Sequence, residues 1–235
     1  MNKNIVFDAD DTLWDEQEML QGFEAAVEEI IDRETGDKSD FKKKFIELEN
    51  ANIPHIGYGF PSYMFSVAEA ITANPDWYKH KDKLLSRIKG VIGQFTMHGP
   101  KLIDGVPQAL SELRSKGFDL YVLTRGVEFE QKFKLEKSGI KHFFKEVAIV
   151  PLKNKETYLS AAFNFGLDAS NICMVGNSVK ADVNPSVEAG WRGIHVPAPT
   201  VWAHDEAIIS DSVRAHSVKK ISDIPDLVLK PSFWN

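Results

Sequence analysis

The chain has 235 residues, 43% of them hydrophobic and 26% charged, so it can bury a core as one large domain or as two smaller ones. Its formal net charge of -6 argues against a nucleic-acid polymer or an anionic membrane as the main partner. A local cluster of charges or a metal ion could still attract a small anionic substrate. The single cysteine, Cys173, excludes an intramolecular disulfide and a cysteine-based zinc site.

The sequence shows no sign of a targeting or membrane segment. Only three apolar residues follow Lys3 before Asp8, too few for a signal peptide. No apolar run approaches the ~20 residues that a membrane span requires. We therefore expect a cytoplasmic protein with no membrane partner, as a monomer or a homodimer.

The first element in chain order is an apolar strand, Ile5–Phe7, which runs into the acidic stretch FDADDTLW. More than a hundred residues separate it from the next strand candidate. Most of this stretch has helical periodicity, and helices are predicted at Gln17–Arg33, Phe41–Leu48, Tyr63–Thr72 and Leu84–Phe95. We interpret residues 15–100 as a helical domain inserted into a core domain formed by residues 1–14 and 101–235.

From residue 101 onward, strand and helix patterns alternate. Further strands are predicted at Leu120–Leu123, Val147–Val150, Ile172–Val175 and Gly193–Val196, with an edge strand near Ala215–Val218. Most of these runs are apolar throughout, as expected for strands that are covered on both faces. Helical patterns that begin at Val106, Glu128 and Glu156 each end at a glycine. This order predicts an α/β fold, a Rossmann-like doubly wound parallel sheet.

Four of the predicted strands are followed by polar residues that a phosphate site would use. In chain order these are Asp8 and Asp10, Thr124 and Arg125, Lys153, and Gly176-Asn177-Ser178 with Asp182. In open α/β sheets, ligands bind outside the carboxyl ends of the strands. We therefore expect the four groups to converge, although they lie far apart in the sequence.

These residues resemble the four motifs of the haloacid dehalogenase-like (HAD) hydrolases. The motifs are Asp8-Ala9-Asp10-Asp11-Thr12, Thr124, Lys153 and Gly176-Asn177-Ser178-x-x-x-Asp182, in the order of the family. The helical insertion matches the position and character of the family's first type of cap domain. The resemblance implies a Mg²⁺-dependent phosphatase that hydrolyses a small phosphorylated metabolite through an aspartyl-phosphate intermediate.

The resemblance also implies a role for each motif residue. Asp8 would be the nucleophile, and Asp10 would protonate the leaving oxygen and then activate water. Thr124 would hydrogen-bond a phosphoryl oxygen, and Lys153 would neutralise charge on the phosphate and the nucleophile. The Mg²⁺ ligands would be Asp8, the backbone carbonyl of Asp10, Asn177 and Asp182. The ion would offset a carboxylate repulsion of about 4 kcal/mol per pair at ~4 Å.

Several of these assignments have an alternative. Asp8 and Asp10 could form only a turn and a helix N-cap, and Thr124 could simply end a strand. Lys153 competes with Lys155, but it stands five residues before Tyr158, a spacing that resembles family members with an aromatic residue on the following helix.

The roles of other residues in or near the motifs also have alternatives. Asn177 replaces the more common aspartate, which removes one negative charge from the metal site. Arg125 would contact phosphate or substrate, or be a solvated loop charge. We expect Asp11 to have a structural role in the turn.

Two aromatic segments could contribute to specificity. The glycines of HIGYGFPSYMF suggest a loop from which Tyr58 or Phe60 selects substrate, or a turn whose aromatic residues pack in the helical domain. Trp202 and His204 could line the edge of the site, although a packed loop is the simpler interpretation.

Three other functions compete with a phosphatase. A 2-haloacid dehalogenase needs no second acid, so Asp10 argues against it. A phospho-accepting signalling protein would be about half as long, would have no helical insertion and would carry its acceptor aspartate after a later strand. A catalytically silent binding protein is disfavoured because all the core groups are present. The sequence does not identify the substrate.

Overall fold

The computed structural model describes residues 3–96, 99–198 and 207–235. The chain divides into two compact units. One comprises Met1–Asp15 with Pro100–Asn235, and the other comprises Glu16–Gly99. We call them the core unit and the helical unit.

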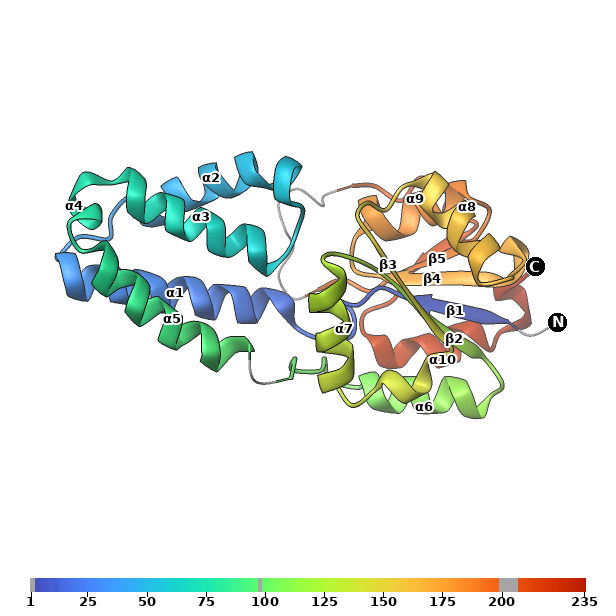
Figure 1. Cartoon of the computed structure of the whole chain (residues 1–235). Helices are drawn as coiled ribbons and strands as arrows, with labels where there is room; N and C mark the ends of the chain where they lie inside the picture. The colour runs from blue at the N-terminus through green and yellow to red at the C-terminus, as the bar shows by residue number, and fades with distance from the viewer. Residues whose placement is uncertain (1–2, 97–98, 199–206) are drawn as a thin grey trace. The chain divides into compact units, whose positions relative to one another are not determined.

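The core unit contains a six-stranded sheet in the order β3-β2-β1-β4-β5-β6, and every neighbouring pair is parallel (Figure 1). The strands are β1 Asn4–Phe7, β2 Asp119–Arg125, β3 Glu146–Val150, β4 Ile172–Gly176, β5 Arg192–His195 and β6 Ala215–Ser217. The predicted strands, including the edge strand, and the α/β fold class are confirmed.

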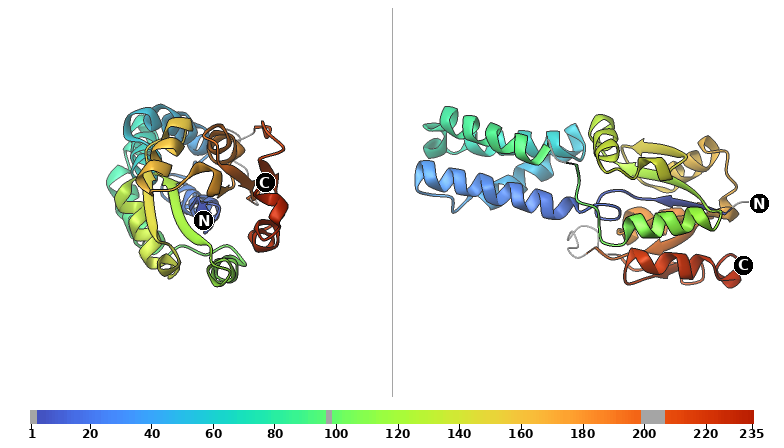
Figure 2. Two further views of the ribbon diagram at one scale, coloured as in Figure 1. Left: turned by 90° about the vertical axis from the view of Figure 1, so that its right-hand side faces the viewer. Right: turned by 90° about the horizontal axis from the view of Figure 1, so that it is seen from below.

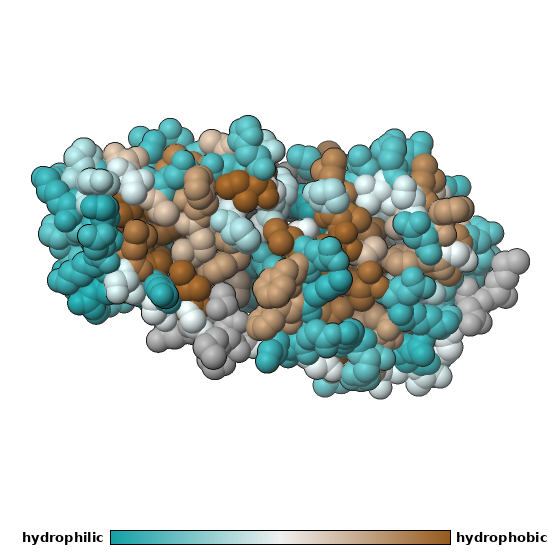
Figure 3. Space-filling model, viewed as in Figure 1, coloured by the Kyte–Doolittle hydropathy of each residue, from teal (hydrophilic) through white to brown (hydrophobic). Residues whose placement is uncertain are grey.

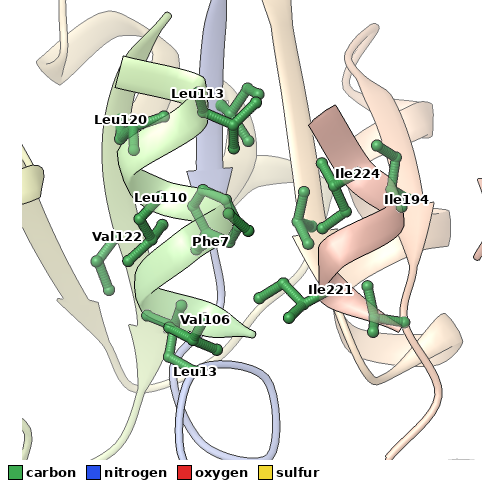
Figure 4. Close-up of a cluster of buried hydrophobic side chains, with 14 of the residues drawn as sticks. Phe7, Leu13, Val106, Leu110, Leu113, Leu120, Val122, Ile194, Ile221 and Ile224 are labelled. Carbon is green, nitrogen blue, oxygen red and sulfur yellow. The ribbon is translucent and has the colours of Figure 1, made fainter. Parts of the chain in front are cut away.

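Alternate side chains of the inner strands enter two separate hydrophobic clusters. In β1, Ile5 and Phe7 belong to one cluster and Val6 to the other, and all three are completely buried. Figure 4 shows Phe7 beside Leu110 and Val122 in the first cluster. A strand that is apolar at every position has to be covered on both faces, which explains the continuous apolar runs in the sequence.

Helices cover both faces of the sheet (Figure 2). Side chains of α6 (Val106–Ser115), α7 (Glu128–Lys137) and α10 (Ile224–Val228) pack into the cluster that contains Phe7. Those of α8 (Lys155–Asn164) pack into the cluster that contains Val6. The short α9 (Asn184–Glu188) contributes Val187 to a smaller cluster with Ala215 of β6.

The described part of the helical unit forms helices around a hydrophobic cluster of its own. They are α1 Glu16–Thr35, α2 Phe41–Ile56, α3 Phe60–Ala73, α4 Pro75–Tyr78 and α5 Lys81–Thr96. The four predicted helices are present, whereas α4 was not predicted. Its first turn is capped by the side chain of Asn74, which accepts hydrogen bonds from the backbone of Asp76 and Trp77.

Of the two interpretations of HIGYGFPSYMF, the structure supports a short turn whose aromatic residues pack in the helical unit. Helix α2 continues through Pro54 to Ile56, and α3 begins at Phe60, so the connection is only residues 57–59. The ring of Phe60 makes an edge contact with Phe23, with ring centroids 5.6 Å apart, and both belong to the core of the helical unit. Phe60 therefore has a packing role.

The surface mixes polar and apolar residues. Phe129, Leu152 and Phe163 are exposed, and brown residues interrupt the teal surface in Figure 3. In the part of the chain that the structure describes, no helix is both long and apolar enough to span a membrane.

Candidate active site

The candidate site lies where β1 and β4 run side by side. From β1 the sheet continues through β2 and β3 in one direction, and from β4 through β5 and β6 in the other. Such a reversal of strand order is where open α/β sheets bind ligands, outside the carboxyl ends of the strands. Asp8 follows β1 at this point, and its amide donates to the carbonyl of Val175 in β4 at 2.9 Å.

Asp8, Lys153 and Asp182 form a buried cluster of charges. The Nζ atom of Lys153 donates to Oδ1 of Asp8 and, at 2.7 Å, to Oδ1 of Asp182. The three residues are 7%, 7% and 1% exposed. Ions are this strongly buried only when they are paired. The structure therefore brings three predicted site residues into direct contact, from the ends of β1, β3 and β4.

The charges of this cluster depend on one another. Burial raises the pKa of Asp8 above its ordinary value, against the opposing effect of Lys153, and Asp182 raises it further. Burial alone lowers the pKa of Lys153, but Asp182 and Asp8 outweigh burial and the net pKa is raised. Lys153 therefore keeps its proton and its positive charge. Two carboxyl groups thus surround a single ammonium group, an arrangement that favours a nearby cation.

Lys153 is held by the first turn of α8. The side chain of Asn154 caps this helix and accepts from the amide of Thr157 at 2.9 Å, while the hydroxyl of Thr157 donates to the carbonyl of Leu152 at 2.9 Å. These bonds fix the chain on both sides of Lys153. Tyr158 is fully buried, and its hydroxyl donates to the carbonyl of Ala181 at 2.9 Å. The spacing noted in the sequence thus ties α8 to the segment that carries Asp182.

Asp182 lies in a π-helical turn, Val179–Val183, directly after β4. The hydroxyl of Ser178 accepts from the amide of Ala181, and the amide of Ser178 donates to Oδ2 of Asp182 at 3.0 Å. A Cβ atom on Gly176 would overlap the Asp182 carboxylate. The glycine of the fourth motif therefore makes room for the carboxylate of the same motif.

Thr12 links the first and fourth motifs. Its hydroxyl accepts from the amide of Asn177 at 3.1 Å and lies 3.3 Å from Oδ1 of Asn177 and 3.5 Å from Oδ2 of Asp8. The carbonyl of Asn177 is also 3.0 Å from Nε2 of His195. These contacts orient the Asn177 amide beside the buried charges. His195 was not among the predicted site residues.

Asp10 belongs to a second, separate set of contacts. Its Oδ1 accepts from Nε1 of Trp14 at 2.7 Å and from Nζ of Lys134 at 3.0 Å, and its Oδ2 accepts from Nε2 of Gln131 at 2.6 Å. Burial alone raises the pKa of Asp10, but Lys134 and the hydrogen bonds outweigh burial, so the net pKa is below its ordinary value. The two aspartates therefore differ in environment although one residue separates them.

The remaining predicted residues lie in different settings. Thr124 is buried at the end of β2, and its hydroxyl is 3.5 Å from the carbonyl of Arg125, at the limit of a hydrogen bond. Arg125 is half-buried, Lys155 is exposed at the start of α8, and Asp11 has the left-handed φ of 56° within the turn. Tyr58 lies in the helical unit.

Two predicted residues, Trp202 and His204, lie outside the part of the chain that the structure describes.

The donor set around Asp8 suits a hard divalent cation. Carboxylate oxygens of Asp8 and Asp182 and the amide oxygen of Asn177 are the ligands that Mg²⁺ prefers. The side chain of Asp10 is instead held by Gln131 and Lys134 of α7. Among residues 3–96, 99–198 and 207–235, no group of three His, Cys, Asp or Glu side chains is arranged to hold a metal. An ion here would therefore rely on the amide and backbone oxygens as well.

The contacts of Gln131 and Lys134 were missed in the sequence. In α7, Phe129 is 81% exposed, while Gln131 and Lys134 are only 4% and 8% exposed. Helical periodicity places apolar residues in the core and cannot identify a polar face that is buried. The only signal was their spacing, which puts both side chains on one face of the helix.

Known proteins with similar sequences and structures are hydrolases of one family. A glyceraldehyde 3-phosphate phosphatase of Methanocaldococcus jannaschii is 28% identical, with 97% of each chain covered. One of Methanopyrus kandleri is 27% identical, covering 83% of this chain and 84% of the relative. A haloacid dehalogenase-like hydrolase structure from Xanthomonas campestris matches with a TM-score of 0.80 at 27% identity, covering 97% of this chain and 90% of that one. Residues 3–190 match the family model of the haloacid dehalogenase-like hydrolases, and the chain therefore belongs to that family.

Proposed function

We propose that this hydrolase is a Mg²⁺-dependent phosphatase that acts on a small phosphorylated metabolite through an aspartyl-phosphate. The observation that carries the proposal is the separation of two aspartates into two environments. Asp8 is paired with the buried Lys153, whereas Asp10 is held by Lys134 and Gln131. Burial raises the pKa of Asp8, whereas the donors around Asp10 lower its pKa and favour its carboxylate form. That form suits the base that takes a proton from water in the second step, and the first step requires the protonated form.

In the first step, a carboxylate oxygen of Asp8 attacks phosphorus, and the bond from phosphorus to the leaving oxygen breaks. Asp10 gives its proton to that oxygen, so the alcohol leaves neutral. In the second step, Asp10 takes a proton from water, the water oxygen bonds to phosphorus, and the bond to Asp8 breaks. Asp8 and Asp10 then regain their starting protonation states, and inorganic phosphate is released.

Other residues of the core unit support both steps. Lys153 keeps its charge beside Asp8 and stabilises negative charge on the transferred group. The buried Thr124 hydroxyl is available to a phosphoryl oxygen. Asp8, Asp182, Asn177 and the carbonyl of Asp10 would hold Mg²⁺, which when bound supplies positive charge that offsets the anionic cluster and the phosphate.

The two relatives named as glyceraldehyde 3-phosphate phosphatases indicate the first substrate to test. A dehalogenase remains the main rival within the family. The proton carrier argues against it, because displacement of a halide needs no protonation of the leaving group. Asp10, held by three donors, is a costly feature for an enzyme that does not use it.

Removal of divalent cations is the test of the proposed function. We expect phosphate release from glyceraldehyde 3-phosphate and p-nitrophenyl phosphate to stop in EDTA and to return with excess Mg²⁺. Zn²⁺ should restore less activity, because the donors are hard oxygens. Halide release from 2-chloropropionate should be absent. Full activity in EDTA would contradict the metal dependence, and halide release without phosphatase activity would favour the dehalogenase.

Two neighbouring lysines provide a matched comparison. Lys153→Met removes the ammonium that contacts Asp8, so we expect kcat to fall by about 100- to 1,000-fold, as for the loss of an oxyanion-hole donor. Lys155→Met changes an exposed residue and should leave kcat near that of the wild type. Steady-state kinetics would be combined with urea unfolding, so that only folded protein is counted. The opposite ranking of the two variants would move the catalytic role to Lys155.

A further inference from the structure

Two polar side chains of α7 are buried against Asp10, while Phe129 of the same helix is exposed and Phe133 is half-buried. Gln131 and Lys134 lie three residues apart, on one face. Both are almost fully buried, whereas Phe129 is 81% exposed and stacks with Phe133 at 6.5 Å. Burial of a lysine and an amide costs free energy unless each is well paired. Lys134 is shared between Asp10 and Glu130, each at 3.0 Å, and Leu135 packs into the core beside it. The helix thus brings two hydrogen-bond donors to Asp10.

The donors hold both oxygens of Asp10. Nε2 of Gln131 is 2.6 Å from Oδ2, and Nζ of Lys134 is 3.0 Å from Oδ1. Nε1 of the buried Trp14 approaches Oδ1 at 2.7 Å from the opposite end of the turn. A carboxylate with donors on both oxygens cannot rotate without breaking hydrogen bonds, so its orientation is fixed before substrate arrives.

The segment at the end of β2 also holds the side chain of Gln131. Its Nε2 is also 3.3 Å from the carbonyl of Arg125. Gly126, the next residue, has a φ of 147°, and a Cβ atom there would lie 2.9 Å from Nε2 of Gln131. A side chain at residue 126 would therefore push the amide away from Asp10. The second motif and α7 together hold the donor in place.

We propose that Gln131 and Lys134 are positioning residues that orient the Asp10 carboxyl for proton transfer. The inference rests on the proposed phosphatase function and deepens it. Neither residue touches the reacting atoms; both act through Asp10. An error of about 1 Å in a proton carrier can cost roughly 100-fold in rate. Loss of either donor should therefore slow the steps that move a proton and spare the attack by Asp8.

The test compares Lys134→Met and Gln131→Glu with Lys132→Met, an exposed residue of the same helix that pairs with Glu128. Gln131→Glu keeps the shape of the side chain and places a carboxylate against Asp10, and urea unfolding would confirm that each variant is folded. We expect kcat for an alkyl phosphate to fall about 10- to 100-fold in the first two variants and to be unchanged in the third. Lys134→Arg, which retains charge and donors, should recover most of the activity.

A second measurement distinguishes a positioning role from a general structural defect of the variants. With p-nitrophenyl phosphate the leaving group needs little protonation, so the first step should stay fast and the second should stall. The two variants should then show a burst of p-nitrophenolate and accumulate phosphorylated enzyme, detected by intact-protein mass spectrometry.

In an Asp10→Asn background, the same substitutions should cause no additional loss, because they act through the group that has already been changed. An equal loss in both backgrounds, or wild-type kinetics for both variants, would overturn the inference. Absence of phosphatase activity in the wild-type protein would instead overturn the proposed function on which the inference rests.

Discussion

Asp8→Asn should abolish turnover and leave no phosphorylated enzyme under any condition. The amide is almost the same size as the carboxylate, but it is a poor nucleophile and carries no charge to pair with Lys153. We expect kcat to fall by at least about 10,000-fold, because no other group of the site takes over the attack on phosphorus. Phosphate release and intact-protein mass spectrometry after an acid quench provide the two measurements.

The same substitution has a structural consequence that can be measured separately. Asp8→Asn removes one of the two carboxylates that Lys153 contacts and leaves Asp182 as the other. Removing one partner of a buried ion pair destabilises the folded protein, although Lys153 keeps Asp182 as a partner here. Urea unfolding would establish that the inactive variant is folded. Residual turnover with a phosphorylated intermediate on another residue would show that Asp8 is not the nucleophile.

The elements of the sheet were predictable because each apolar run is short and is followed by a polar residue, a glycine or a proline. For a strand that is buried on both faces, sequence pattern and tertiary packing agree, as in β1, where Ile5, Val6 and Phe7 are all fully buried. Parallel topology places Asp8, Lys153 and Asp182 at one edge of the sheet, and the turns that follow β3 and β4 bring them into contact. All three come after the carboxyl ends of strands, so the fold brings them to the same edge whatever the intervening sequence.

What the sequence did not reveal depends on contacts between distant residues. The burial of Gln131 and Lys134 was not predicted, because it depends on hydrogen bonds to Asp10, which is far away in the sequence. The predicted helix ends at Leu48, whereas α2 continues to Ile56 with Pro54 inside it, although proline normally disrupts a helix. Local conflicts of this kind are expected at functional sites, where packing is given up for chemistry.

The fourth motif contains residues that the sequence predicts and a local structure that it does not. Its residues could be recognised in the sequence, but the π-helical turn that aims Asp182 could not. Such a turn adds one residue to the helical repeat and is common at functional sites. Gly176 is required there by the volume of the Asp182 carboxylate rather than by backbone conformation. Spacing identified the residues, whereas only the structure gives the reason for the spacing.

Asp10→Asn should separate the two chemical steps rather than abolish both. The substitution fits the site, because the buried Oε1 of Gln131 has no hydrogen-bond partner among the described residues and can accept from the new amide if the Gln131 amide turns over. Trp14 and Lys134 can still donate to the remaining oxygen. Loss of function in this variant would thus reflect proton transfer more than loss of structure.

With p-nitrophenyl phosphate, Asp10→Asn should release one equivalent of p-nitrophenolate and then stall, because an amide cannot activate the water of the second step. With an alkyl phosphate even the first step should be slow, since an alkoxide leaves poorly without a proton. We expect steady-state kcat to fall about 100- to 10,000-fold, the usual contribution of a general acid–base group. Mass spectrometry of the stalled enzyme should show one added phosphoryl group, and peptide mapping should place it on Asp8. Normal turnover of both substrates would mean that Asp10 carries no proton, and the donors on α7 would then hold a carboxylate with no part in the chemistry.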